Sequence, residues 1–100
     1  MSLINTNVTS TIANVYTSSG NTVISVAYFC NVNPLTITFN LYAVPNSGSA
    51  TTATQIYKDV QVAAGDTFVV DMEKLVLGNG DTIQANASSN ITATISYVGI

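Results

Sequence analysis

The sequence contains no histidine, no tryptophan and no arginine, and only 7% of its 100 residues are charged. Histidine is the commonest general base and a principal zinc ligand, so Ser-His-Asp and Cys-His catalytic sites are excluded and a zinc site has no ligand set. The only positive charges are Lys58 and Lys74, and the net charge is -3. Binding to nucleic acid by neutralising phosphates is therefore excluded as well.

A single cysteine, Cys30, rules out an internal disulfide bond. It lies in the apolar run 26–30, where we expect a small buried hydrophobic side chain rather than a reactive thiol. The first residues lack the basic and apolar regions of a signal peptide, and no apolar run approaches the roughly 18 residues that cross a bilayer. We therefore expect neither a classical secretion signal nor a membrane span.

Carboxylates are the remaining candidates for catalysis or metal binding: Asp59, Asp66, Asp71, Glu73 and Asp81. Asp66 and Asp81 each follow a turn glycine, so we expect them to accept hydrogen bonds from local backbone N–H groups rather than to form a paired-carboxylate site. Calcium prefers such oxygen ligands, but no loop has the spaced acidic pattern of a dedicated site. We predict a non-enzymatic protein with no catalytic residue, metal site or cofactor.

Short runs of valine, isoleucine, threonine, tyrosine and phenylalanine dominate the chain, and Gly, Asn, Ser, Pro and Asp separate them at intervals of about 8 to 12 residues. This pattern predicts an all-β protein, an antiparallel β-sandwich of the jelly-roll or immunoglobulin-like type with seven to eight strands. The expected strands are 11–17, 22–31, 35–44, 53–62, 67–72, 81–87 and 91–98. Segment 71–77 either holds one helical turn or continues as a strand into 75–77.

Two strands show a clear period of two. In 35–44 the apolar face begins at Leu35 and continues through Ile37, Phe39 and Leu41. In 91–98 apolar residues alternate with threonine and serine. The run 22–31 is apolar on both faces, with residues 24, 26, 28 and 30 expected on one of them, so we expect it to be covered on both sides.

Two irregular segments leave alternatives open. Residues 1–10 form an N-terminal arm that either adds a strand to its own sheet or is exchanged between subunits, and residues 11–100 form the single domain. The loop 45–52 is either a contact element or a plain connector. Five tyrosines stand mostly in strands, where packing is the simpler expectation and a sugar-binding platform the alternative: Tyr16, Tyr28, Tyr42, Tyr57 and Tyr97.

A series of strand-and-turn blocks resembles the small β-sandwich virion proteins of tailed bacteriophages. The blocks are VYT (15–17), TVISV (22–26), IYKDV (56–60), VAAGDT (62–67), EKLVL (73–77), GDTIQA (80–85) and ISYVGI (95–100). The resemblance covers most of residues 11–100 and rests on the order and spacing of the blocks. One departure is the ending YVGI, because similar chains more often carry an acidic residue before the final aliphatic one.

The resemblance implies a virion structural protein, either a capsid decoration (cement) protein or a small neck, tail or baseplate component. No ligand residues follow from it, because the shared blocks mark strands and turns. Scarce charge and an apolar composition favour burial against other subunits. We expect a homotrimer, made in the host cytoplasm, that binds the major capsid protein or other virion proteins and no nucleic acid or membrane. The alternative is a host-recognition, carbohydrate-binding module of the tail or baseplate.

Overall fold

The structure is a computed structural model that describes residues 2–70 and 75–99. Within these residues all regular elements are strands, and no helix is long and apolar enough to cross a membrane. The strands are β1 (Ser2–Val8), β2 (Ala13–Thr17), β3 (Thr22–Cys30), β4 (Ile37–Val44), β5 (Gln55–Val62), β6 (Thr67–Val70), β7 (Leu75–Leu77), β8 (Thr82–Ala87) and β9 (Ile91–Gly99). All pair antiparallel, in two packed sheets. The predicted antiparallel β-sandwich is confirmed.

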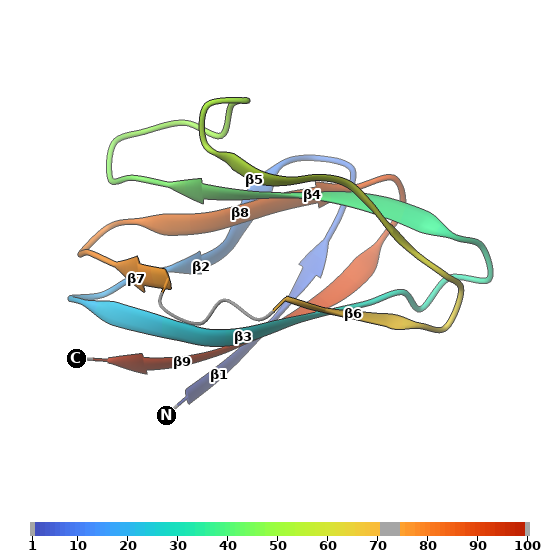
Figure 1. Ribbon diagram of the computed structural model, residues 1–100, viewed down its shortest axis with the longest axis horizontal. Coiled ribbons are helices and arrows are strands. Elements are labelled where there is room, and N and C mark those ends of the chain that lie inside the picture. Colours follow the sequence, from blue (N-terminus) through green and yellow to red (C-terminus); the bar gives the residue numbers. More distant parts are fainter. Residues whose placement is uncertain (1, 71–74, 100) are drawn as a thin grey trace.

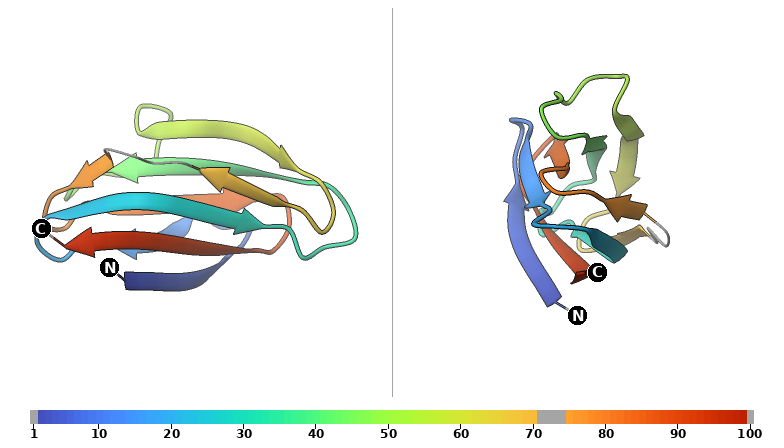
Figure 2. Two further views of the ribbon diagram at one scale, coloured as in Figure 1. Left: turned by 60° about the horizontal axis from the view of Figure 1, so that its bottom comes forward. Right: turned by 90° about the vertical axis from the view of Figure 1, so that its left-hand side faces the viewer.

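The two sheets are named here after their central strands. The β3 sheet has the order β1-β9-β3-β6, and β7 also pairs with β3 (Figure 1). The β4 sheet has the order β2-β8-β4-β5. Figure 2 shows the two layers facing each other, with β1 and β2 at the same side of the sandwich. The chain therefore changes layer at every connection between successive strands except β4–β5 and β6–β7.

Residues 2–8 form an edge strand that pairs with β9 along its whole length, from Ser2↔Tyr97 to Val8↔Ile91. Val8 lies in the core. Within the single chain, the segment predicted as an arm thus adds a strand to its own sheet. Exchange of this segment between subunits stays a prediction. Of segment 71–77, predicted to hold one helical turn or to continue as a strand into 75–77, residues 75–77 form the strand β7, and residues 71–74 lie outside the described residues.

The strand predicted to start at Leu35 begins two residues later. Leu35 lies in the β3–β4 connection with 74% of its surface exposed, whereas Ile37, Phe39 and Leu41 alternate into the core as expected. Pro34 precedes Leu35 in a bend. Since proline cannot donate to a ladder, its position favours a later start of β4.

A β-bulge at Ser25 changes the alternation of β3. In the pairing with β9, Ile24 lies opposite Tyr97 and Val26 lies opposite Ser96, so Ser25 is the extra residue. Ile24 points into the core before the bulge, and Ala27 and Phe29 do so after it. The prediction that residues 24, 26, 28 and 30 share a face is therefore wrong, because the inserted residue reverses the period of two.

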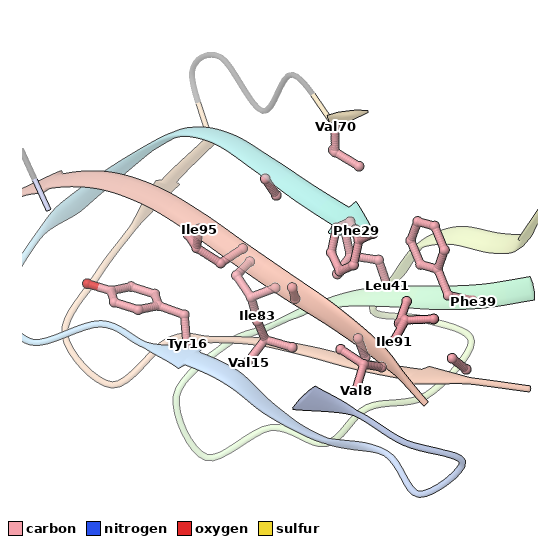
Figure 3. Close-up of a cluster of buried hydrophobic side chains, with 14 of the residues drawn as sticks. Val8, Val15, Tyr16, Phe29, Phe39, Leu41, Val70, Ile83, Ile91 and Ile95 are labelled. Carbon is pink, nitrogen blue, oxygen red and sulfur yellow. The ribbon is translucent and has the colours of Figure 1, made fainter. Parts of the chain in front are cut away.

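The core lies between the inner faces of the two sheets (Figure 3). Phe29 and Phe39 stack across it with ring centroids 4.5 Å apart, and Phe68 packs edge-on against Phe39 at 5.8 Å. Most other core residues are aliphatic, among them Val8, Val15, Leu41, Val70, Ile83, Ile91 and Ile95. Burial of these side chains is the main driving force that holds the two sheets together.

Uncharged polar side chains close both ends of the core. At one end the fully buried Asn31 donates from Nδ2 to the carbonyls of Leu35 (2.8 Å) and Val62 (2.9 Å) and accepts from the Asn33 N–H. At the other end, Ser18 donates to Thr22 Oγ1 at 2.9 Å. Among the described residues, no buried side-chain nitrogen or oxygen lacks a partner. The interior polar groups are thus satisfied without ions.

Gly80 has a positive φ of 85°, and a Cβ there would lie 2.6 Å from Cγ of Asn46. Gly20 also has a positive φ, of 73°, but a Cβ there would meet nothing within 4 Å. We expect Gly20→Ala to lower the free energy of unfolding by about 1 kcal/mol through backbone strain alone. Gly80→Ala should lower it by at least about 2 kcal/mol, because the Asn46 side chain must also move. Urea denaturation of both variants checks this, and equal losses would contradict it.

Candidate functional site

The described carboxylates do not converge. Asp66 lies in the turn between β5 and β6, and Asp81 lies in the turn between β7 and β8, at opposite ends of the sandwich (Figure 1). The nine residues of β3 separate these ends by roughly 30 Å at the usual rise of a strand. Among the described residues, no three of His, Cys, Asp or Glu lie close enough to hold a metal ion. Asp71 and Glu73 lie outside the described residues.

Asp81 joins two loops through its carboxylate. Its Oδ1 accepts from the Asn46 N–H and its Oδ2 accepts from the Gly78 N–H, both at 2.8 Å. Asp66 accepts from the adjacent Thr67 N–H at 2.8 Å. Both carboxylates thus accept from backbone N–H groups, as the sequence predicts, but Asp81 also anchors the distant loop that follows β4.

Loop 45–52 is held by this anchor and by its own hydrogen bonds. The Gly48 N–H donates to the Pro45 carbonyl, and the Thr54 hydroxyl lies within hydrogen-bond distance of the Ser49 and Thr51 carbonyls. Whether this loop is a contact element or a plain connector stays a prediction. The hydrogen bond to Asp81 holds its first residues, at Asn46, in place.

The outer face of the β3 sheet carries a group of apolar side chains, which we call the outer apolar face. Its members are Leu3, Val23, Val26, Tyr28, Val69, Val76 and Val98. Val23 lies opposite both Val76 and Val98, and Tyr28 lies opposite Val69, whereas Leu3 and Val26 each lie opposite Ser96. Leu3 is 66% exposed, Tyr28 40%, Val69 53% and Val76 56%. The left view of Figure 2 has β3 and β9 of this sheet in the foreground.

Only uncharged residues surround the outer apolar face in the described part of the chain. The remaining outward positions of β9 and β1 are filled by Thr92, Thr94, Ser96, Asn5 and Asn7. The described charges are Lys58, Asp59, Asp66 and Asp81, which lie on β5 or in turns. A contiguous exposed apolar surface with an uncharged border is typical of a protein–protein contact.

The outer face of the β4 sheet is different, because amide side chains cover it and bond to one another. Asn40 donates from Nδ2 to Asn86 Oδ1 at 2.9 Å, and its own Oδ1 accepts from Gln55 Nε2 and from the Asp59 N–H. These amide groups thus form hydrogen bonds to other groups of the same sheet. The two outer faces thus offer different chemistry: among the described residues, a group of exposed apolar side chains lies on the β3 sheet and no such group lies on the β4 sheet.

A groove of about 510 Å³ opens between β1 and β2, at the side where these two edge strands lie in opposite sheets. Its walls combine apolar side chains with hydroxyls and an amide: Ile4, Thr6, Asn14, Val15, Tyr16, Thr17, Ser19, Thr22, Tyr97 and Gly99. Its volume lies within the usual range for small-ligand sites. Within residues 2–70 and 75–99 no charged residue lines it, so these walls would recognise a ligand through hydroxyls, an amide and aromatic contact.

Two of the five tyrosines meet in this groove. The rings of Tyr16 and Tyr97 lie 4.6 Å apart at an angle of 40°, and the Tyr16 hydroxyl is 3.2 Å from Thr22 Oγ1. Tyr57 packs against Phe68, and Tyr42 is almost fully buried, so packing is confirmed for these residues. Tyr28 stands on the outer apolar face.

Cys30 lies beside the outer apolar face, opposite Thr67 and Thr92, and is only partly buried. The prediction of a buried thiol is therefore wrong. The bulge at Ser25 is the reason, because it sends Cys30 outward while Phe29 enters the core.

The members of the outer apolar face that sequence reasoning missed are Leu3, Val69 and Val76. Val69 and Val76 belong to runs without polar residues, FVV and LVL, which signal burial on both faces of a strand. Leu3 carries no such signal.

Comparison with family models, with curated proteins and with solved structures finds no match to the chain.

The two turn carboxylates offer a matched test of the Asp81 anchor. We expect Asp81→Ala to lower the free energy of unfolding by about 2 kcal/mol, because two backbone N–H groups lose a charged acceptor. Asp66→Ala should cost about 0.5 kcal/mol, since its one bond is local and exposed. Chemical denaturation measures both. Limited proteolysis of Asp81→Ala should also show faster cleavage within residues 45–52, and an unchanged cleavage rate would contradict the anchor.

Proposed function

We propose that the chain is a non-enzymatic structural protein of a phage virion, and that it binds the outside of the capsid shell as a decoration (cement) protein. The observation that carries this proposal is the outer apolar face, which lies in a wholly uncharged surround within the described residues. Burying such a face against a shell removes apolar area from water without stranding an ion. Its partner is then the major capsid protein, and its location is the virion surface.

The strand order supports the same proposal. β6 and β7 pair with successive parts of one edge of β3, at 27–30 and 22–24, so together they occupy one strand position. Two facing sheets of four positions follow, in the orders β1-β9-β3-β6/β7 and β2-β8-β4-β5. We infer a sandwich of the jelly-roll type, an architecture that occurs in viral capsid proteins and in lectins. This support is an analogy of fold and adds to the resemblance of the strand-and-turn blocks.

Binding to shells tests the proposal directly. Empty shells of the phage that encodes the chain, prepared without it, are mixed with purified protein, and bound protein and the melting temperature of the shell are measured. We expect saturable binding and a higher melting temperature. Absence of binding would overturn the proposal.

A lysine on the outer apolar face tests which surface binds. Val69→Lys should weaken shell binding at least about tenfold, because the contact would bury an unpaired charge. Gln61→Lys is the matched control, since it also adds an exposed lysine to a strand, but in the β4 sheet. Equal binding by the two variants would place the contact elsewhere.

The alternative function is host recognition through a neutral carbohydrate, and the groove between β1 and β2 favours it. Tyr97 and the hydroxyl-rich walls supply aromatic contact and hydrogen bonds of the kind that sugars require. This alternative predicts saturable binding to a neutral oligosaccharide of the host surface. Asn14→Ala, in the groove wall, should abolish that binding, and Asn7→Ala, on the outer side of β1, should leave it unchanged. A glycan array followed by titration calorimetry measures both, and no binding to the array excludes the alternative.

A further inference from the structure

The edges of the two sheets differ in how well they are protected against pairing with another strand. Proteins protect edge strands by charge, proline, bulges or short length. β5 has register shifts and carries Lys58 and Asp59, and Asp59 has a φ of 51°. β2 has a register shift between Asn14 and Tyr16, and β6 and β7 have only four and three residues.

β1 has none of these protections. It is seven residues long, without charge or proline, and its register with β9 is unbroken from end to end. Its other edge pairs with no strand in the described part of the chain. A row of backbone N–H and C=O groups is therefore free to form a ladder.

We propose that the free edge of β1 binds the same edge of a second copy of this chain, antiparallel and about a two-fold axis perpendicular to the sheet. Such an axis keeps the outer face of each copy on the same side, so outward residues must pair with outward residues. When Asn5 lies opposite Asn5 of the second copy, every outward residue faces an outward residue, and all seven residues of both strands are paired. The two β3 sheets then form one continuous sheet across the dimer.

The side chains of β1 suit this self-pairing. With Asn5 on the axis, Leu3 lies opposite Asn7 of the second copy and Ile4 lies opposite Thr6, so no two charges meet. Asn5 Oδ1 already accepts from Thr94 Oγ1 at 2.8 Å. Its amide nitrogen has no partner among the described residues and so remains available to the second Asn5. Residues directly opposite in an antiparallel pair lie close enough for such a bond.

The groove between β1 and β2 gives independent support. It opens on the side of the molecule where β1 is the free edge, and Ile4 and Thr6 of β1 form part of its wall. A second copy placed edge to edge brings its own groove opposite the first. The partly exposed apolar atoms of Ile4 and Tyr97 are then shielded from water, whereas they are open to it in an isolated chain.

The contact has two-fold symmetry, so we expect a dimer in place of the trimer predicted from the sequence. Sedimentation velocity over a concentration series should show a dimer. Asn5→Lys should raise the dissociation constant at least about tenfold, because two lysines would face each other across the axis. Gln61→Lys, on the protected edge strand β5, is the control and should leave the dimer unchanged. A wild-type monomer or trimer, or equal effects of the two substitutions, would overturn the proposal.

Cysteine cross-linking tests the register even where a lysine variant folds poorly. In a Cys30→Ser background, Asn5→Cys should form a disulfide-linked dimer on mild oxidation, because the two thiols lie opposite each other on the axis. Leu3→Cys should not form this disulfide. Leu3 faces Asn7 of the second copy, and Leu3 of that copy lies four residues farther along the strand. Cross-linking of Leu3→Cys as fast as Asn5→Cys would refute the register. Shell binding is measured in a separate experiment. If the chain is a monomer that binds shells, the edge contact is rejected and the proposed function is not.

Discussion

The bulge at Ser25 is the constraint on which the two surfaces of the β3 sheet depend. β9 pairs with one edge of β3, and β6 and β7 pair with its other edge. One inserted residue reverses its alternation, so Ile24 and Phe29 both enter the core although they are five residues apart. The same reversal turns Val26, Tyr28 and Cys30 outward. An apolar core and an apolar outer face therefore arise from one strand.

The molecule also shows how a chain with few ions closes its core. Burying an unpaired charge costs several kcal/mol, whereas an amide or hydroxyl with all its hydrogen bonds costs little. Asn31 closes one end of the sandwich through three hydrogen bonds, and Ser18 and Thr22 close the other. Asp81 has a comparable role at the surface, where its charge stays near solvent and joins two loops. Charge is thus confined to turns and to β5 in the described part of the chain.

The two proposed contacts fit together in space. The outer apolar face lies on one face of the β3 sheet, and the free edge of β1 lies at the side of the same sheet. Pairing through β1 keeps both outer faces on one side, so a dimer presents two copies of the outer apolar face to a shell. Bivalent attachment of this kind raises the overall affinity without any new contact. The proposed carbohydrate site requires an open groove, and the dimer covers this groove. Carbohydrate binding therefore needs the single chain, whereas shell binding is compatible with the dimer.

Much of the fold follows from the sequence, because strands leave local signals. Alternation in 35–44 and 91–98, together with glycine- or asparagine-rich turns, predicts the sandwich and places most strands within two residues of their observed bounds. The sequence does not decide the strand at 2–8, because a polar segment with scattered apolar residues forms a strand only when it can pair with the edge of β9. The sequence also predicts Asp66 and Asp81 as acceptors in turns, because the bonds from Thr67 and Gly78 are local, but it does not predict the bond from the distant Asn46 to Asp81.

The sequence by itself determined the scarcity of charge, the β-sheet class and the absence of histidine chemistry, since these depend on composition and short-range pattern. Only the tertiary structure decided that Ser25 is a bulge, that Cys30 and Val69 point outward, and that β1 ends the sheet with a free edge. Each of these depends on which strand lies beside which, and pairing between residues as distant as Leu3 and Ser96 leaves no local trace in the chain.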